Sequence, residues 1–234
     1  HFGYCLHLAL APVGYLWVGR NLGLGWRPAG LGALIYTFSG YQAAHLVHYN
    51  FVTAAAHVPL LLAALQVALR TNRPRWWRLL ALEAALAFLC SHPQVFLMAA
   101  LVAGLWLVVG GCGRGATSVM NRLPGLVAAA AAALLLVMPQ VLPTLELARE
   151  RQGLTASESV GAEAFVTSYP FRALDLVRVV LPDLFGTADA NVIGGGPAFH
   201  ETCAFIGGGA LLLVLVGLAI GRRHNGYAFA LSLL

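Results

Sequence analysis

The chain has 234 residues, of which 59% are hydrophobic and 10% charged, and its mean hydropathy is +0.78. A water-soluble domain of this size has too little interior to hide so much apolar surface, so the composition excludes an ordinary soluble enzyme. The formal net charge of +5 comes from arginines spread along the chain, which argues against a nucleic-acid-binding protein.

The arginines divide the chain into long apolar stretches. Most of them lie in four short clusters: Arg20 and Arg27; Arg70, Arg73, Arg75 and Arg78; Arg114 and Arg122; and Arg222 and Arg223. All acidic residues except Glu83 lie between Glu146 and Glu201. Because the cytoplasmic loops of membrane proteins are rich in arginine, this pattern predicts a multi-pass membrane protein whose arginine clusters face the cytosol.

A membrane-spanning helix needs about 20 residues. The apolar stretches predict seven complete spans, at residues 3–19, 29–47, 51–69, 77–91, 94–111, 123–145 and 202–221. An eighth span begins near Tyr227. With the arginines in the cytosol, these spans alternate in direction without conflict. The predicted fold is therefore an all-α polytopic transmembrane bundle.

The polar part of the chain follows the sixth span. We divide the chain into a bundle of six spans at residues 1–146, an external segment at 147–200, and the seventh span with the start of an eighth at 201–234. Within the external segment, Ser168 and Pro170 introduce a helical pattern, which predicts a short interfacial helix at 169–181. The chain begins at His1 and ends in an apolar run, so we expect an internal fragment of a longer protein.

Two turns on the predicted external face, HLVHYN and SHPQ, concentrate polar side chains. Together with the start of the third span they contribute His45, His48, Asn50, His57, His92 and Gln94. These residues are interpreted as hydrogen-bonded interfacial groups, as a pocket for a charged ligand, or, because His45 and His48 are three apart on one helix face, as metal ligands. The four cysteines show no zinc-binding or disulfide spacing, so the sequence predicts no metal site and identifies no cofactor.

A carboxylate and two guanidinium groups follow the sixth span. Glu146, Arg149 and Arg151 suit recognition of a phosphate or pyrophosphate, because arginine forks match phosphate oxygens. An ordinary solvated helix end is the alternative interpretation. Glu201, just before the seventh span, is interpreted either as an acid–base group or as an interfacial cap.

Glu83 and Gln140 lie within predicted spans. An unpaired carboxylate near the bilayer centre costs about 2–3 kcal/mol or more, so Glu83 is expected to face the interior of the bundle. The sequence leaves open whether Glu83 is a structural hydrogen-bonding partner or part of a ligand path. Gln140 lies where the sixth span approaches the external face.

Six stretches of the chain carry a family resemblance through their order and their positions at span ends. They are LGWRPAGLGALIYTFSGY (24–41), HLVHYNFVTAAAHVPLLL (45–62), SHPQ (91–94), PQVLPTLELARERQG (139–153), LPDLFG (181–186) and HETCAFIGGGALLL (200–213). Together they resemble the YfhO-like family of bacterial polytopic membrane proteins, which is grouped with the GT-C-fold glycosyltransferases. The resemblance covers nearly the whole chain.

The resemblance implies an enzyme of the bacterial cytoplasmic membrane that transfers a sugar from a polyprenyl-phosphate donor to a lipid or cell-envelope polymer on the external face. It also implies that the catalytic acidic residue lies in an external loop upstream of this chain. Within the chain, Arg149 and Arg151 would hold the phosphate, with a divalent metal as the alternative. The pocket would be lined by His45, His48, Asn50, His92 and Gln94, with Glu201 as a further candidate.

Two other functions are consistent with the sequence. A non-catalytic transporter of lipid-linked sugar or polymer would use Glu83 and Gln140 along a path through the bundle. A structural membrane subunit would have external polar residues that point apart. The expected partners are the lipid bilayer and the polyprenyl-phosphate donor, and no nucleic acid.

Overall fold

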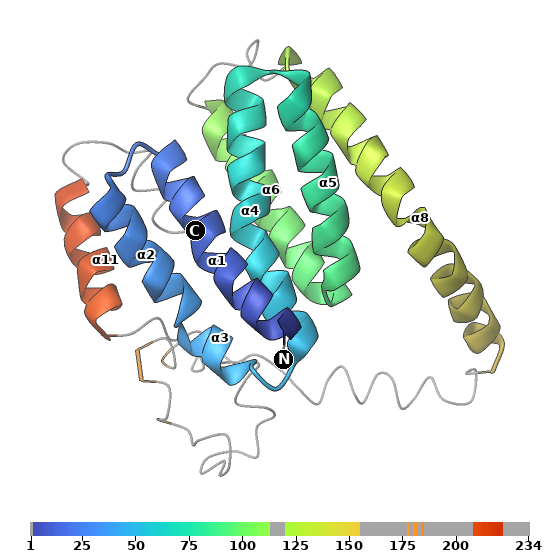
Figure 1. The fold of residues 1–234 in the computed structure, drawn as a ribbon, viewed down its shortest axis with the longest axis horizontal. Coiled ribbons are helices and arrows are strands. Elements are labelled where there is room, and N and C mark those ends of the chain that lie inside the picture. The colour runs from blue at the N-terminus through green and yellow to red at the C-terminus, as the bar shows by residue number, and fades with distance from the viewer. Residues whose placement is uncertain are drawn as a thin grey trace.

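The computed structural model describes residues 2–112, 120–154 and 208–221, with a few isolated residues between 177 and 184. The described segments form the helices α1 (Phe2–Asn21), α2 (Trp26–Thr37), α3 (Gly40–Ala44), α4 (Tyr49–Thr71), α5 (Pro74–Cys90), α6 (Pro93–Cys112), α8 (Leu123–Leu154) and α11 (Gly208–Gly221). The prediction of an all-α fold is confirmed for these segments (Figure 1).

Three of these helices are long and apolar enough to cross a membrane. They are α1, α4 and the part of α8 from Leu123 to Glu150. With 23 residues, α4 is about 34 Å long, which matches a hydrocarbon core of about 30 Å. A shorter apolar helical stretch, Val95–Leu107, lies within α6. The chain therefore has the helices that membrane association requires.

The predicted span at residues 29–47 is wrong as one continuous helix. Its first part, α2, has 12 residues and is about 18 Å long, which is too short to cross a bilayer alone. A new helix, α3, begins after Ser39, whose hydroxyl accepts a hydrogen bond from the backbone N–H of Gln42. The apolar composition of this stretch concealed the break, because hydropathy does not depend on where a backbone turns.

The sixth predicted span also differs, since α8 continues past residue 145 to Leu154. Neither Pro139 nor Pro143 ends the helix. The hydroxyl of Thr144 donates to the carbonyl of Gln140 at 2.7 Å, close to the backbone bonds that the prolines cannot make. The polar residues after 145 therefore prolong the helix, and the first residues of the predicted external segment at 147–200 are helical.

Other sequence predictions lie largely or wholly outside the described residues. Of the predicted interfacial helix at 169–181 only isolated residues are described, among them Leu181, whose backbone N–H donates to the carbonyl of Val177 at 2.9 Å. The start of the span at 202–221 and the eighth span near Tyr227 are also outside the described ranges. The division of the chain into three parts stays a prediction.

The centre of the bundle is α4. In the most apolar part of each helix, 78% of the α4 residues are buried inside the protein, against 28% in α1 and 17% in α8. The helix packs against α1 on one side and α5 on the other, while α2 packs on α1 and α8 on α5. Leu61, Leu65 and Leu69 of α4 meet Trp77 and Leu80 of α5 in the main apolar cluster.

The turn between α4 and α5 is built by its local sequence. Asn72 ends α4 in the left-handed conformation, with φ at 49°, and its backbone N–H donates to the carbonyl of Ala68 at 2.8 Å. Pro74 begins α5, where a missing N–H costs nothing. The indole N–H of Trp77 then donates to the Asn72 side chain at 3.0 Å. These residues fix α4 and α5 as an antiparallel pair.

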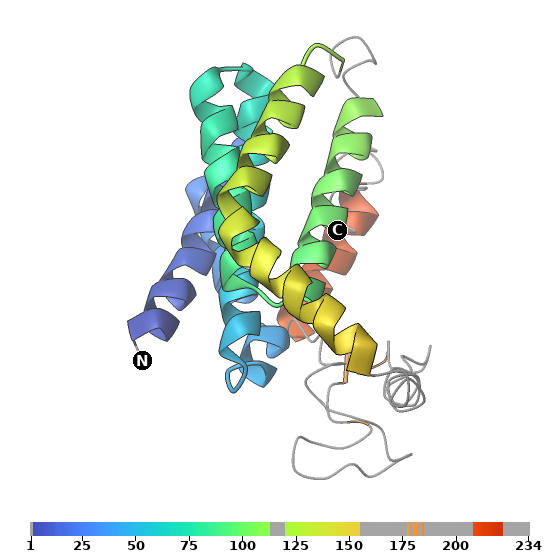
Figure 2. The same cartoon turned by 90° about the vertical axis from the view of Figure 1, so that its right-hand side faces the viewer.

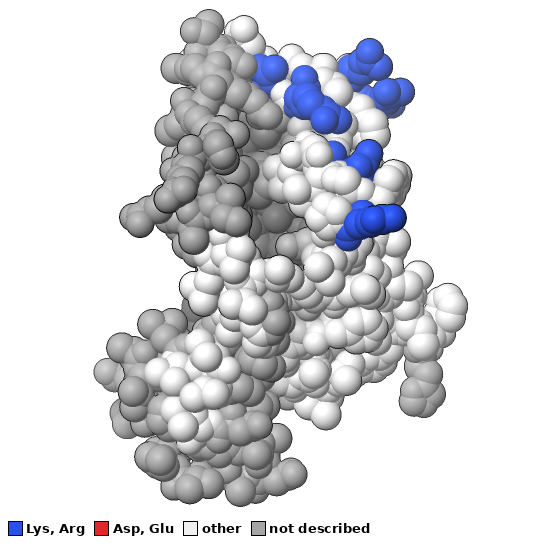
Figure 3. Space-filling model, turned by 90° about the vertical axis from the view of Figure 1, so that its left-hand side faces the viewer, with Lys and Arg blue, Asp and Glu red and all other residues white. Residues whose placement is uncertain are grey.

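Arg149 lies on the second half of α8, away from the other described arginines. Those, which belong to the predicted clusters between Arg20 and Arg122, lie at one end of the bundle. Figure 3 shows them gathered there, where α1 ends, α2 begins and α4 turns into α5; Figures 1 and 2 place the start of α8 at the same end. Arg122, just before α8, donates from Nε to the carbonyl of Leu69 near the end of α4. The His45–Asn50 turn and the turn between α5 and α6 lie at the opposite end. The predicted separation of the two kinds of turn is confirmed for the described clusters.

Glycine allows α1 and α4 to approach closely. A Cβ atom at Gly14 of α1 would lie 2.9 Å from both the backbone nitrogen and Cγ of Leu60 in α4. Small residues at such contacts let helix backbones pack closely in membrane proteins. A glycine on α8 has the same role, because a Cβ at Gly125 would overlap the indole of Trp77.

We predict that Gly14→Ala destabilises the bundle, because the new methyl group would push against the α4 backbone rather than a movable side chain. The expected loss is about 1–3 kcal/mol, measured as a lower midpoint of thermal unfolding in detergent. Gly30→Ala in α2 is the matched control, because no described atom lies within 4 Å of the added Cβ. Equal stability of the two variants would contradict the close α1–α4 contact.

Candidate functional site

The structure brings together histidines from the two predicted polar turns. His45 and His48 precede α4, and His92 precedes α6. The ring of Phe51 in α4 connects them, with its centroid 4.9 Å from that of His45 and 5.2 Å from that of His92, each at an interplanar angle of 21°. Residues that are far apart in the sequence therefore form one aromatic and imidazole group at the end of the bundle opposite the arginines.

Within this group, His45 is a packing residue. Its exposed fraction is 1%, and its Nδ1 donates to the backbone carbonyl of Tyr41 at 2.8 Å. The Tyr41 ring lies against it, with centroids 4.2 Å apart. His48 and His92 are partly exposed and Asn50 is exposed, so these three side chains are the ones that a ligand can reach.

The prediction that His45 and His48 lie on one helix face is wrong. Because α3 ends at Ala44 and α4 begins at Tyr49, the two histidines flank a turn, and their ring centroids are 6.1 Å apart. The spacing argument for a metal site at this pair therefore fails.

The remaining predicted site residues are less closely grouped. Glu146, Arg149 and Gln140 are exposed on α8. Figure 1 shows the second half of α8 diverging from α3 and α4, so the structure does not bring these three to the histidines. The side chains of Gln94 and Arg151 and the whole of Glu201 lie outside the described residues. Their predicted roles stay predictions.

Glu83 faces the interior of the bundle, as the sequence analysis expected. Its carboxylate accepts a hydrogen bond of 2.7 Å from Nδ1 of His57 in α4. The side chains of His57 and Glu83 are 6% and 12% exposed, so the pair is largely shielded from solvent. Such a pair provides the polar partner that a carboxylate needs inside an apolar bundle.

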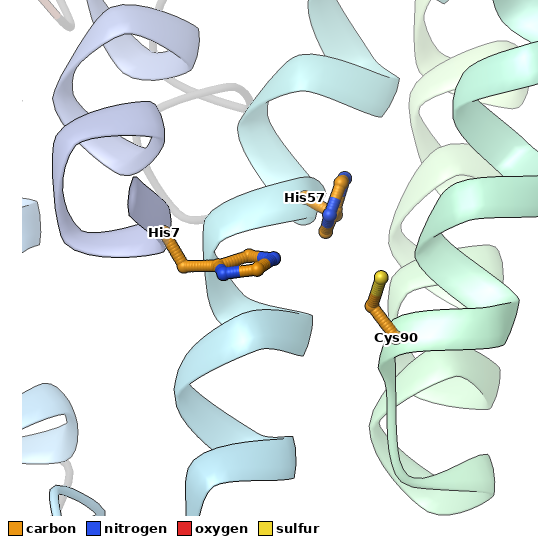
Figure 4. Close-up of side chains that lie close together, drawn as sticks. All are labelled: His7, His57 and Cys90. Carbon is orange, nitrogen blue, oxygen red and sulfur yellow. The ribbon is translucent and has the colours of Figure 1, made fainter. Parts of the chain in front are cut away.

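Two further groups complete a cluster that the sequence analysis did not identify. His7 of α1, His57 of α4 and Cys90 of α5 each offer one ligand atom, and these atoms all lie within 4.8 Å of one another (Figure 4). The rings of His7 and His57 meet edge to face, with centroids 5.5 Å apart. The three residues come from three different helices, so no local motif could have revealed them. The sequence analysis named His57 of this cluster, but grouped it with the external turns, and it expected Glu83 beside it to be buried.

The cluster is held by neighbouring contacts. Nδ1 of His7 donates to the carbonyl of Gly3 at 2.8 Å, and the ring of Tyr49 lies edge-on to His7. A Cβ at Gly3 would overlap the Tyr49 phenol, so glycine leaves room for the Tyr49 ring in this position. The hydroxyl of Thr53 donates to the carbonyl of Cys90, which ties the end of α5 to α4.

The two groups differ in the chemistry that they can support. The histidines at the end of the bundle, with Asn50 beside them, can donate hydrogen bonds to a polar or anionic headgroup. The buried cluster combines imidazole, thiol and carboxylate in a shielded place, which is the donor chemistry of a transition-metal site. No known protein family, curated protein or solved structure matches this chain.

We predict that Glu83→Leu destabilises the protein by about 1–3 kcal/mol, because it leaves Nδ1 of His57 buried without its acceptor. The double variant His57→Leu/Glu83→Leu should lose less than the sum of the two single variants, because no unpaired polar group then remains. Thermal unfolding in detergent measures all three.

Glu83→Gln is the matched control, because its amide oxygen still accepts from His57. It should be more stable than Glu83→Leu. Strictly additive effects of the single substitutions would contradict a direct His57–Glu83 interaction.

Proposed function

We propose that this chain is part of a polytopic glycosyltransferase of a bacterial cytoplasmic membrane, with a GT-C-like bundle of about seven spans and a truncated eighth. The enzyme transfers a sugar from a polyprenyl-phosphate donor to a lipid or cell-envelope polymer on the external face. The observation that carries this proposal is the grouping of His45, His48 and His92 at the end of the bundle opposite the arginines.

Exposed apolar side chains support placement in a lipid bilayer. Large aliphatic residues are open to the surroundings on α6, α8 and α11, including Leu97, Leu101, Leu134, Leu135, Leu136, Leu212 and Leu215. Water disfavours apolar surfaces of this extent, whereas lipid chains would cover them. These helices are therefore proposed to face lipid.

Aromatic residues support two membrane interfaces. Trp17, Trp26 and Trp76 lie near the helix ends beside the arginines, and Arg20 and Arg75 stack over two of these rings. At the other end, Tyr4, Tyr41 and Tyr49 lie in the first turns of α1, α3 and α4. Tryptophan and tyrosine are enriched where a membrane meets water. By the positive-inside rule, the arginine end faces the cytosol and the histidine end faces outward.

The broken second span is consistent with this orientation. Together α2 with 12 residues and α3 with 5 residues provide about 26 Å of helix. Ser39 in the break, Thr37 at the end of α2 and Gln42 in α3 are all buried. Irregular backbone at membrane depth is tolerated where protein covers it.

In the proposed reaction, His48, Asn50, His92 and Gln94 line the site for the donor headgroup, and Glu201 is a further candidate. Arg149 and Arg151 lie near the end of α8, which diverges from α3 and α4 and so from the histidines. They are proposed to hold the phosphate as a separate group, because guanidinium groups stabilise the negative charge that develops on the departing phosphate. By its resemblance to the YfhO-like family, the chain would rely on a carboxylate in another part of the whole protein to deprotonate the acceptor hydroxyl.

A transporter of lipid-linked sugar or polymer is the second candidate, because the buried His57–Glu83 pair places polar groups inside the bundle. A continuous polar path would favour it. However, the next buried polar residue of α4, Gln66, lies nine residues after His57, about two and a half turns, and so is on the opposite side of the helix. Gln140 is exposed on α8. These positions favour the enzyme.

We predict that polyprenyl phosphate, the product common to all such donors, binds the histidine end. It should raise the unfolding temperature of the full chain in detergent, whereas polyprenol without the phosphate should not. His48→Ala/His92→Ala should weaken binding about tenfold, or 1.4 kcal/mol. Arg73→Gln at the other end is the control and should bind as the unchanged chain does. Equal stabilisation by polyprenol, or sensitivity only to Arg73→Gln, would contradict the proposed site.

Transfer distinguishes the enzyme from the transporter. Membranes containing the whole protein should convert polyprenyl-phosphate glucose or polyprenyl-phosphate mannose to polyprenyl phosphate when acceptor is present. A transporter would bind these lipids and leave the sugar–phosphate bond intact.

A further inference from the structure

The buried cluster of His7, His57 and Cys90 has a free coordinating atom on each side chain. Nδ1 of His7 is occupied by the carbonyl of Gly3, and Nδ1 of His57 by the carboxylate of Glu83. Each imidazole therefore has Nε2 left for another partner. Cys90 forms no disulfide within the described part of the chain, so its Sγ is also available.

Nε2 of His57 carries the strongest indication of a ligand. This atom is buried and has no hydrogen-bond partner among the described residues. The exposed fraction of His57 is only 5% and that of His7 is 9%. A buried nitrogen without a partner is costly, and the same ring is firmly oriented from its other side by Glu83. Figure 4 shows the His7 and His57 rings and the Cys90 thiol converging on one place.

The arrangement around His57 is the one that orients metal-binding histidines in proteins. A carboxylate on one ring nitrogen fixes the tautomer and strengthens the other nitrogen as a donor to a metal. The backbone carbonyl of Gly3 orients the His7 ring in the same way, by accepting a hydrogen bond from its Nδ1. Charge also balances, because a divalent cation would neutralise one thiolate and the Glu83 carboxylate in a place that water reaches poorly.

We propose that His7, His57 and Cys90 bind a divalent transition-metal ion, Zn²⁺, through the two Nε2 atoms and Sγ, with Glu83 as the outer partner of His57. Imidazole and thiolate are the donors that Zn²⁺ prefers, and three protein ligands leave a fourth position open for water or a substrate. The thiol proton of Cys90 leaves to solvent as the metal binds. This inference does not depend on the proposed sugar transfer.

The distances are compatible with a small closing movement. Typical Zn–N and Zn–S bonds of about 2.0–2.3 Å place tetrahedral ligand atoms roughly 3.3–3.6 Å apart. The three atoms lie within 4.8 Å of one another, so side-chain rotations that move each ligand atom by about 1 Å would complete the site. The cluster lies about 12 Å along α4 from its first residue, on the side of the histidine end.

Cobalt(II) is the probe for this site, because it replaces Zn²⁺ and gives an intense absorption band when a thiolate is bound. The full chain, purified in detergent and stripped of metal, should show this band on titration with one equivalent of Co²⁺, and Zn²⁺ should abolish it. A variant that keeps only Cys90, with Cys5, Cys112 and Cys203 changed to serine, should keep the band. Cys90→Ser should lose it.

Substitution of the imidazoles and of Glu83 tests the rest of the site. His7→Ala and His57→Ala should each lower the affinity for Co²⁺ at least tenfold. Glu83→Gln should lower it by about 10- to 100-fold while keeping the band, because the outer partner is not a ligand. His48→Ala is the matched control and should bind Co²⁺ as the unchanged chain does. Circular dichroism and metal-free thermal unfolding show whether each variant is folded. Stabilisation by Zn²⁺ should be present in the unchanged chain and in His48→Ala, and reduced in the variants of His7, His57 and Cys90.

Three results would overturn the proposal. They are the absence of a thiolate band in the unchanged chain, its persistence in Cys90→Ser, and its dependence on His48 in place of His7 and His57. Where Cys90→Ser does not fold, Cys90→Ala gives the same comparison.

Discussion

The proposed placement of this bundle in a membrane depends on one constraint, which is that a guanidinium group is very costly in hydrocarbon. The described arginine clusters therefore lie at one end of the helices, and the apolar segments run away from that end and return to it. Arg122 shows how tightly this end is joined, because its side chain donates to the carbonyl of Leu69 near the end of α4. At the opposite end of α4 the histidines gather with aromatic and uncharged polar groups, while the charged residues Glu146 and Arg149 lie on the diverging part of α8.

The directions of α4 and α5 explain how the polar residues come together. Because α4 and α5 are antiparallel and joined by a short turn at Asn72, the start of α4 and the end of α5 must meet. Phe51 can then stack with His92, Thr53 can bond to the end of α5, and His57 can pair with Glu83. The central position of α4 follows from its apolar surface on several sides. Its polar residues are consequently buried and need partners.

The sequence predicted the helical class, the separation of arginine turns from histidine turns, and the inward direction of Glu83, because each follows from the cost of charge in an apolar medium. It did not predict the break at Ser39, because a hydroxyl that caps a helix leaves little trace in hydropathy. The predicted sixth span ran through Pro139 and Pro143 but ended at residue 145, because the charged residues that follow lower the hydropathy without ending the helix, which continues to Leu154.

The sequence analysis could not predict that His57 is the partner of Glu83, or that His57 forms a cluster with His7 and Cys90, for another reason. A pair such as His57 and Glu83 depends on the register of α4 and α5, and this register is set by contacts such as Trp77 with Asn72 and Thr53 with Cys90. A shift of one residue in either helix would turn these side chains apart. Periodicity within a single helix carries no information about that register.

The central claim is that the two ends of the bundle face opposite sides of a membrane. In a background with the native cysteines changed to serine, Val47→Cys and Asn121→Cys place one thiol at each end, since Val47 is 81% exposed and Asn121 is exposed beside Arg122. A membrane-impermeant maleimide added to intact cells should label the thiol at position 47, and the thiol at position 121 only after the cells are permeabilised. Labelling of both thiols in intact cells, or of neither, would contradict the account.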